Sequence, residues 1–235
     1  MRTVAMSLTV VGILLMAGSG PGTRWAWWNF RVGLLLFAGS GVVGLIAAVT
    51  GGVAWWRAPV PSQGNWMSAL PVVIGLSLFL LPLWKLLAVR QTPPIHDVTT
   101  DLADPPRFSS VVPLRGGDPK GIDQRTVSMH QNAYRDLAPV VLPFPPDRAF
   151  ARAIETARAM DWHIVSQRPE DGMIEATDTT RWFGFRDDVA IRIRPLLGDQ
   201  TRIDVRSTSR VGVGDAGQNA RRIRAFLQRL RRIEH

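Results

Sequence analysis

Three apolar stretches dominate the first 90 positions of the chain, and only Lys85 interrupts them with a charge. A helix needs about 20 mostly apolar residues to cross a hydrocarbon core of about 30 Å. We therefore predict two or three transmembrane helices, at about residues 4–20, 32–56 and 67–89. The first stretch is the shortest. Because it follows Arg2 and ends in small residues, it also fits a cleaved signal peptide.

Two further patterns support the membrane assignment. Tryptophans stand beside the second apolar stretch, as in the aromatic belts of membrane proteins; they are Trp25, Trp27, Trp28, Trp55 and Trp56. Within that stretch small residues recur every fourth position, at Ser40, Gly44, Ala48 and Gly52. Small side chains let helix backbones approach closely. This face is predicted to pack on a neighbouring span or on another membrane protein, or it reflects the ordinary composition of membrane helices.

Residues 91–135 are rich in Pro and Gly and are predicted to be a linker without a long helix. Asp97, Asp101 and Asp104 lie there close to His96. Their spacing matches no calcium-binding loop, so we interpret them as solvated loop acids rather than as a metal site.

From residue 136 the pattern becomes regular and predicts a β-α-β-β-β-β-α order. Strands are expected at 140–142, 162–167, 172–179, 188–194 and 201–209, and helices at 147–160 and onward from a capping-box-like start at Asp215 and Gln218. Asp147 and Asp215 are the predicted caps of the two helices. The apolar helix faces are expected to be Phe150, Ala153, Ile154 and Ala157, then Ala220, Ile223, Leu227 and Leu230. Arg192, Arg194, Arg202, Asp204 and Arg206 are predicted to point outward from the strands.

This order predicts an α+β fold: a two-layer sandwich in which two helices cover one face of a curved antiparallel sheet. TATA-binding-protein-like and helix-grip topologies both fit it. The predicted organisation is a transmembrane region (1–90), a linker (91–135) and one α+β domain (136–235).

Charge divides the chain at the same boundary. All 19 acidic residues lie after position 96, whereas the first 90 residues hold six basic ones. The remaining 145 residues carry 22 basic side chains against 19 acidic ones, an ordinary balance for a soluble domain. With this balance and no recognised motif, nucleic acid is not an expected partner.

Candidate catalytic chemistry is sparse. There is no Cys, and the four His residues have no partner at metal-ligand spacing. Neither a phosphate-binding glycine loop nor a serine nucleophile elbow is present. We therefore predict no cofactor and no metal, and favour a non-enzymatic function; an uncharacterised hydrolase-like enzyme is the alternative.

One segment concentrates polar residues and glycines: Arg206 to Arg222, between the last strand and the last helix. Free backbone donors at a helix N-terminus and the forked guanidinium of Arg206 or Arg210 suit a carboxylate or phosphate. The alternative is structural: Asp215 caps the helix, the arginines pair with Asp204 or Asp187, and Asn219 fixes the loop.

The string Arg206-Ser-Thr-Ser-Arg-Val-Gly-Val-Gly-Asp-Ala-Gly-Gln-Asn-Ala-Arg-Arg-Ile223 resembles the bacterial and plastid family called domain of unknown function 1499. The resemblance covers about residues 95–232. It implies signature, candidate binding positions at Arg206, Ser207, Ser209, Arg210, Gly212, Asp215, Gly217, Asn219 and Arg222. It implies no activity. Similar proteins often carry secretory or lipoprotein signals, which implies an extracytoplasmic domain; this chain differs in having several spans and no Cys.

The sequence thus predicts a multi-pass protein of the bacterial inner (cytoplasmic) membrane with a non-enzymatic envelope domain. That domain is expected to bind a protein partner, a lipid headgroup or a small anion at the strand-to-helix corner. Six arginines in the last helix could also meet anionic lipid. An accessory or assembly subunit of a larger membrane complex is the alternative. The count of basic residues leans toward a cytoplasmic domain and the family resemblance toward an extracytoplasmic one.

Overall fold

The chain forms two compact units in the computed structural model, which describes residues 1–57, 66–117, 122–212 and 214–232. The first unit comprises Met1–Arg90 together with Thr180–Gly184. The second comprises Gln91–Thr179 and Phe185–His235. Residues 118–121 of the predicted linker lie outside the described residues.

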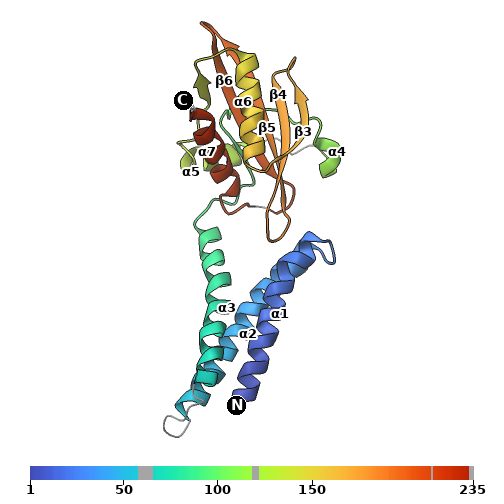
Figure 1. Cartoon of the computed structure of the whole chain (residues 1–235). Coiled ribbons are helices and arrows are strands. Elements are labelled where there is room, and N and C mark those ends of the chain that lie inside the picture. The colour runs from blue at the N-terminus through green and yellow to red at the C-terminus, as the bar shows by residue number, and fades with distance from the viewer. Residues whose placement is uncertain (58–65, 118–121, 213, 233–235) are drawn as a thin grey trace. The chain divides into compact units, whose positions relative to one another are not determined.

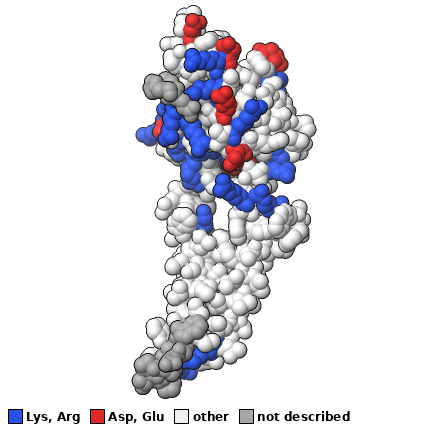
Figure 2. All heavy atoms as spheres, viewed as in Figure 1, with Lys and Arg blue, Asp and Glu red and all other residues white. Residues whose placement is uncertain are grey.

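Three long helices build the first unit (Figure 1): α1 (Arg2–Arg24), α2 (Phe30–Trp56) and α3 (Trp66–Arg90). Asn29 begins α2, because its side chain accepts hydrogen bonds from the amides of Arg31 and Val32. All three helices are long and apolar enough to cross a membrane, which confirms the predicted spans. In Figure 2 the visible surface of these helices carries charge only toward their ends.

The small-residue face of α2 is largely a packing seam within this unit. A Cβ on Gly44 would lie 2.6 Å from Leu78 Cβ and 2.7 Å from the Gly75 carbonyl, so α2 and α3 meet there backbone to backbone. Ser40 and Ala48 are buried as well, whereas nothing lies within 4 Å of a Cβ on Gly52. Three of the four positions therefore serve contacts between the spans of this chain.

The second unit is built on one antiparallel sheet in the order β1-β6-β5-β4-β3. The strands are β1 (Asp97–Thr99), β2 (Val140–Leu142), β3 (His163–Arg168), β4 (Met173–Thr179), β5 (Arg186–Leu196) and β6 (Gln200–Ser209). β2 also pairs with β6, beyond the end of β1. The long β5–β6 hairpin is the centre of the sheet, and its register sets which side chains share a face.

Helices α6 (Pro146–Ala159) and α7 (Gln218–Arg231) cover one face of the sheet (Figure 1). The predicted apolar faces of both helices are buried in one core with Ile174, Ile191 and Val205. Trp162 stacks on Phe226 in this core with ring centroids 5.2 Å apart. The predicted two-layer α+β arrangement is thus confirmed.

The opposite face of the sheet is covered by residues 100–116, which we call the strap. It contains the short helix α4 (Val112–Arg115) and contributes Phe108 and Val111 to a small apolar cluster with Ala190. The prediction that the charged residues of β5 and β6 point to solvent was wrong in this respect. Asp204 and Arg206 are buried, because the strap covers the face from which they project.

Three other details differ from the sequence prediction. The predicted linker contributes β1 and helix α5 (Gln124–Ala133) to the second unit, in addition to the strap. Asp147 does not cap α6, because that helix already begins at Pro146, with Pro145 as its N-cap. Asp97 and Asp101 are not solvated loop acids, because each is held by arginine side chains of β6.

Candidate functional site

The corner, residues 206–222, joins the end of β6 to the start of α7. Strand alternation sends its side chains to opposite faces of the sheet. Ser207 and Ser209 lie on the side of α7, whereas Arg206 and Arg210 lie on the side of the strap. The structure therefore places the nine signature positions in one segment but divides their polar side chains between two environments.

On the helix side Arg222 is the centre of a buried network. Its Nη2 donates to Asp187 at 2.6 Å and its Nε to Asp178 at 2.7 Å. Its Nη1 donates to Asn219 Oδ1 at 2.6 Å and to Ser207 Oγ at 3.1 Å. Every nitrogen of this guanidinium is engaged, so Arg222 ties α7 to β4, β5 and β6.

The same residues hold the segment through which the chain enters the second unit. Asn219 Nδ2 and the Ser209 amide both donate to the carbonyl of His96, at 2.9 and 3.0 Å. A Cβ on Gly214 would lie 3.3 Å from Pro94 Cα, and one on Gly217 3.3 Å from Thr92 Cγ2. The glycines thus permit close approach of the entry segment, 92–96, to the corner.

On the strap side, both arginines hold buried carboxylates. Arg206 binds Asp97 with two nitrogens, at 2.9 and 2.6 Å, and donates to the Pro106 carbonyl. Arg210 binds Asp188 with Nε and Nη2, at 2.9 and 2.8 Å. Its remaining nitrogen, Nη1, donates to the carbonyl of Leu114 at 3.0 Å, at an exposed edge of the strap.

Asp215 supplies the anion at the start of α7. Its carboxylate accepts from the amides of Gly217, at 2.8 Å, and Asn219. Burial raises the pKa of Asp215, while these two amide hydrogen bonds oppose the shift. Gly212 and Gly217 have φ of +91° and +74°, values that favour glycine and allow the chain to turn here. The prediction that Asp215 is the N-cap was wrong, because α7 begins at Gln218 with Gly217 as its N-cap. The Asp215 carboxylate still accepts from an amide of the first helical turn, that of Asn219.

Arg206, Arg210 and Arg222 of the corner thus have internal acids as partners. Of the two acids expected in the structural alternative, Asp187 pairs with Arg222, whereas Asp204 belongs to a different cluster. Binding of an external ligand by the nine signature positions stays a prediction.

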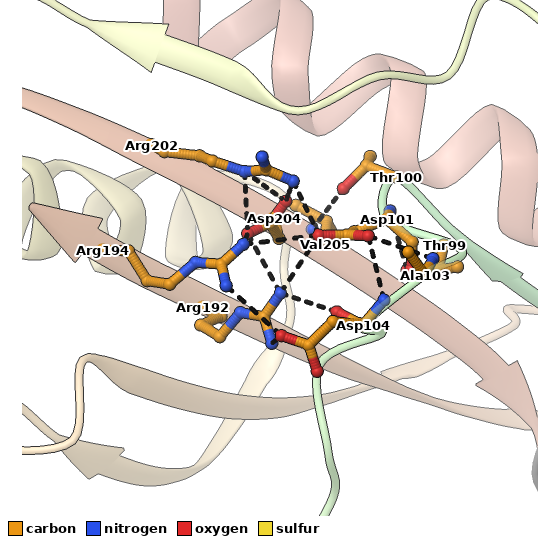
Figure 3. A network of polar contacts seen from close by, with 10 residues as sticks. All are labelled: Thr99, Thr100, Asp101, Ala103, Asp104, Arg192, Arg194, Arg202, Asp204 and Val205. Atoms are coloured by element: carbon orange, nitrogen blue, oxygen red, sulfur yellow. Dashed lines mark hydrogen bonds and ion pairs between the residues drawn. The ribbon is translucent and has the colours of Figure 1, made fainter. Parts of the chain in front are cut away.

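A second cluster, which the sequence did not predict, fixes the start of the strap (Figure 3). Three arginines of β5 and β6 surround three acids; they are Arg192, Arg194 and Arg202, with Asp101, Asp104 and Asp204. The shortest contacts are Arg202 to Asp101, at 2.6 Å, and Arg194 to Asp204, at 2.8 Å. The alternation of charge along the two strands was visible in the sequence. The partners from residues 101 and 104 were not.

A third cluster fixes the far end of the strap on Glu175, which is fully buried. Its carboxylate accepts from the amides of Ser109, Ser110 and Val111, at 3.0–3.2 Å, and from Ser109 Oγ at 2.7 Å. Arg168 adds an ion pair at 3.2 Å. Burial alone would raise the pKa of Glu175, but these hydrogen bonds outweigh it and lower the pKa below its usual value.

Among the described residues, no three His, Cys, Asp or Glu side chains are grouped so that they could hold a metal ion. His130 of α5 is buried, and its Nε2 accepts from the amide of Thr99 at 3.3 Å. Burial lowers the pKa of His130, so the neutral ring is favoured. It serves as a hydrogen-bond acceptor for β1.

Comparison with known proteins gives a family match that lies almost wholly in the second unit. No curated protein matches the chain. The family model described as "Protein of unknown function (DUF1499)" matches residues 97–230, which run from the first residue of β1 nearly to the end of α7. The match covers more than half of the chain, and the protein belongs to this family.

Proposed function

We propose that this protein is a membrane-anchored, non-enzymatic module of the bacterial cell envelope. The three apolar helices support insertion in a membrane. The family resemblance favours the cytoplasmic membrane with the second unit on its extracytoplasmic side. Large domains cross membranes largely regardless of a small excess of basic residues, so the residue count does not oppose this side. A phosphatase fused after His235 should be active and a fluorescent protein that matures only in the cytosol dark; the reverse result would place the unit in the cytoplasm.

The corner engages an anionic group, from a partner protein, a lipid headgroup or a small anion. The observation that carries this proposal is a local surplus of positive charge. Asp188 is shared by Arg115 and Arg210, so one carboxylate faces two guanidiniums. Arg186 is exposed and lies two residues before Asp188 on β5, so strand alternation puts this third cation on the same face of the sheet as the pair.

The geometry of Arg210 suits a double role. Nε and Nη2 hold Asp188 internally, while Nη1 lies at the exposed edge of the strap beside the Leu114 carbonyl. An incoming carboxylate or phosphate would meet Nη1 and the guanidinium of Arg186 without breaking the internal pair. Charge-assisted hydrogen bonds of this kind are about twice as strong as neutral ones.

The non-enzymatic part of the proposal follows from the same pairing. The acids that pair with the corner are each held by arginines across short distances, and Asp188 has its oxygens occupied by Thr177, Arg115 and Arg210. A general base needs an acceptor free to take a proton from a substrate. Because the oxygens of these carboxylates are already occupied by hydrogen bonds, they instead support a structural role, in which they hold the arginines of the corner in position.

The test uses the full chain in nanodiscs. The probes are inorganic phosphate in zwitterionic nanodiscs, and anionic lipid in place of zwitterionic lipid. Each should raise the melting temperature of the wild type. Arg186→Gln should abolish that rise and leave the unliganded melting temperature unchanged, since an exposed arginine contributes little to folding. Arg221→Gln, an exposed arginine one turn into α7, is the matched control.

Arg210→Gln should lose binding and some stability, because the buried Asp188 then keeps only Arg115 and Thr177 as partners; hydrogen bonds to a charged group contribute about 1.5–3 kcal/mol. If the wild type ignores both phosphate and anionic lipid while Arg210→Gln melts early, the corner is a purely structural joint.

A further inference from the structure

The loop between β4 and β5 has an unusual composition for a hairpin turn. Residues 180–185 read Thr-Arg-Trp-Phe-Gly-Phe, with three aromatic side chains in four positions. Turns normally use Gly, Pro, Asn, Asp and Ser, which tolerate the backbone geometry and the solvent. Trp182 is nonetheless 46% exposed. The turn therefore presents large apolar groups where polar ones would be expected.

The backbone of the loop is well defined. The Gly184 amide donates to the Thr180 carbonyl at 3.0 Å, and Gly184 has φ of +69°, which lets the chain reverse. The last ladder pair below the turn joins Thr179 to Arg186. Closing the turn through the backbone leaves the side chains of Arg181, Trp182 and Phe183 at its tip.

The loop lies at the end of the sheet where the chain enters from α3. β1 begins at Asp97, which pairs with Thr208, and Ser209 beside it pairs with Asp187 at the start of β5. The β5–β6 turn lies at the opposite end of the same strands. Leu197 in this turn is 96% exposed. The β5–β6 turn is therefore also apolar, but it is remote from the point where the chain enters the sheet.

Thr180–Gly184 group with the helices as part of the first unit. Arg24, the last residue of α1, donates from Nη1 to the carbonyls of Thr180 and Arg181, at 3.2 and 2.8 Å. Phe183 meets Phe37 of α2 edge to face, with centroids 5.8 Å apart.

Trp182 packs on Gly20 of α1, where a Cβ would collide with the indole ring. The loop thus reaches past the ends of α1 and α2 by one to two helical turns.

We propose that Thr180–Gly184 is a membrane-interface anchor, in which the rings of Trp182 and Phe183 occupy the headgroup level of the bilayer that α1–α3 span. Trp and Tyr favour this level because an amphipathic ring can meet both lipid and water. The helix ends that meet the loop carry the same chemistry, since Trp25 and Trp27 are exposed there. Arg181, which is exposed, adds a cation suited to lipid phosphate. The partner of the loop is the lipid interface.

The chain contains no Cys, so a single introduced thiol can be labelled cleanly. Full-length Phe183→Cys and Leu197→Cys variants would each carry an environment-sensitive fluorophore and be reconstituted in liposomes. The Phe183 label should emit at shorter wavelength and be quenched several-fold more by lipid-borne quenchers than by aqueous iodide. The Leu197 label, on the remote turn, should show the opposite preference.

Two results would overturn the proposal. Equal behaviour of the two labels would mean that the loop is in water. A Phe183 label that emits at short wavelength but resists both quenchers would mean that protein, not lipid, surrounds the loop. Because Phe183→Cys itself removes one ring, Thr180→Cys with the three aromatics intact repeats the measurement. Trp182→Ser in that variant should shift the label toward iodide accessibility, and an unchanged label would count against anchoring by the ring.

Discussion

The hold of Glu175 on the strap leads to a quantitative prediction. Glu175→Gln keeps the size of the side chain but replaces one carboxylate oxygen with an NH2 group. In the wild type, the Glu175 carboxylate accepts from three consecutive backbone amides, one hydroxyl and Arg168. An amide NH2 cannot accept, so at least one buried donor loses its partner and Arg168 loses its counter-charge.

The magnitude follows from the burial of these groups. Leaving a buried donor unpaired costs about 1–3 kcal/mol, and hydrogen bonds to a charged group contribute about 1.5–3 kcal/mol. We therefore expect Glu175→Gln to lower the free energy of unfolding by about 3–5 kcal/mol, the range for a broken buried ion pair. For a domain of this size that corresponds to a drop in melting temperature of about 10 °C. Amide hydrogen exchange should accelerate first in residues 100–116.

The pH dependence gives an independent check. Hydrogen bonding lowers the pKa of Glu175 in the folded protein, so its contribution is present above the unfolded-state pKa of 4.5. That contribution is lost as the pH falls through the lower folded pKa. Glu175→Gln should therefore be less sensitive to acid than the wild type over this window.

The exposed Glu170→Gln, five residues earlier, makes the same chemical change without a strap contact. If both variants unfold within about 0.5 kcal/mol of the wild type, the argument from buried donors fails.

Three further outcomes are expected. Gly44→Leu should cost about 1–3 kcal/mol by overpacking the α2–α3 seam, measured by thermal denaturation in detergent, whereas Gly52→Leu should not; equal effects would contradict the seam. Because burial lowers the pKa of His130, the unfolded chain takes up the proton first, so stability should fall as pH drops below about 6.5. His130→Gln should remove that slope in melting temperature, and exposed His163→Gln should retain it. Asp215→Ala should cost about 0.5–2 kcal/mol in chemical denaturation, because the amides of Gly217 and Asn219 lose their acceptor at the start of α7, and no loss would exclude this role.

The regular elements could be predicted because periodicity depends only on local sequence. Phe150, Ala153 and Ile154 share one face of any helix, and Val189, Ile191 and Ile193 share one face of any strand. In each of these elements only one face is apolar, so only that face can be buried in the core. The order of elements in residues 136–235 followed from this periodicity. The two or three N-terminal helices were predicted from the length of their apolar stretches.

The strap and the neighbouring β1 could not be predicted, because hydrogen bonds and ion pairs, rather than a periodic apolar pattern, hold these segments on the sheet. β1 has only three residues, Asp97–Thr99, and all three are buried, so no alternation marks it. Arg192, Arg202 and Asp204 are charged and alternate with apolar residues, which is also the pattern of a solvated sheet face. Only the partner acid Asp101, about 100 residues away in sequence, shows that this face is covered. Single-sequence reasoning contains no information on such pairing.

For the corner, the residue types were informative and the partners were not. The sequence indicated a polar joint before α7 and a helix-start role for Asp215. It did not reveal that Asn219 binds the His96 carbonyl, because backbone carbonyls leave no trace in the amino-acid pattern. The aromatic loop at residues 180–185 was visible as Trp-Phe-Gly-Phe, but its meaning depends on which end of the sheet it occupies.

Three acids on the strap side, Asp101, Asp188 and Asp204, each pair with more than one arginine, and this has a consequence for tolerance to mutation. Asp204 is contacted by Arg192, Arg194 and Arg202, so any one of these can change while two remain to hold it. Loss of Asp204 instead leaves the three arginines with only Asp101 and the largely exposed Asp104 as counter-charges. In a variant library of this face, substitutions should therefore be lost unevenly. Substitutions of the arginines would be retained, whereas substitutions of the few aspartates would be lost, because several ion pairs depend on each aspartate.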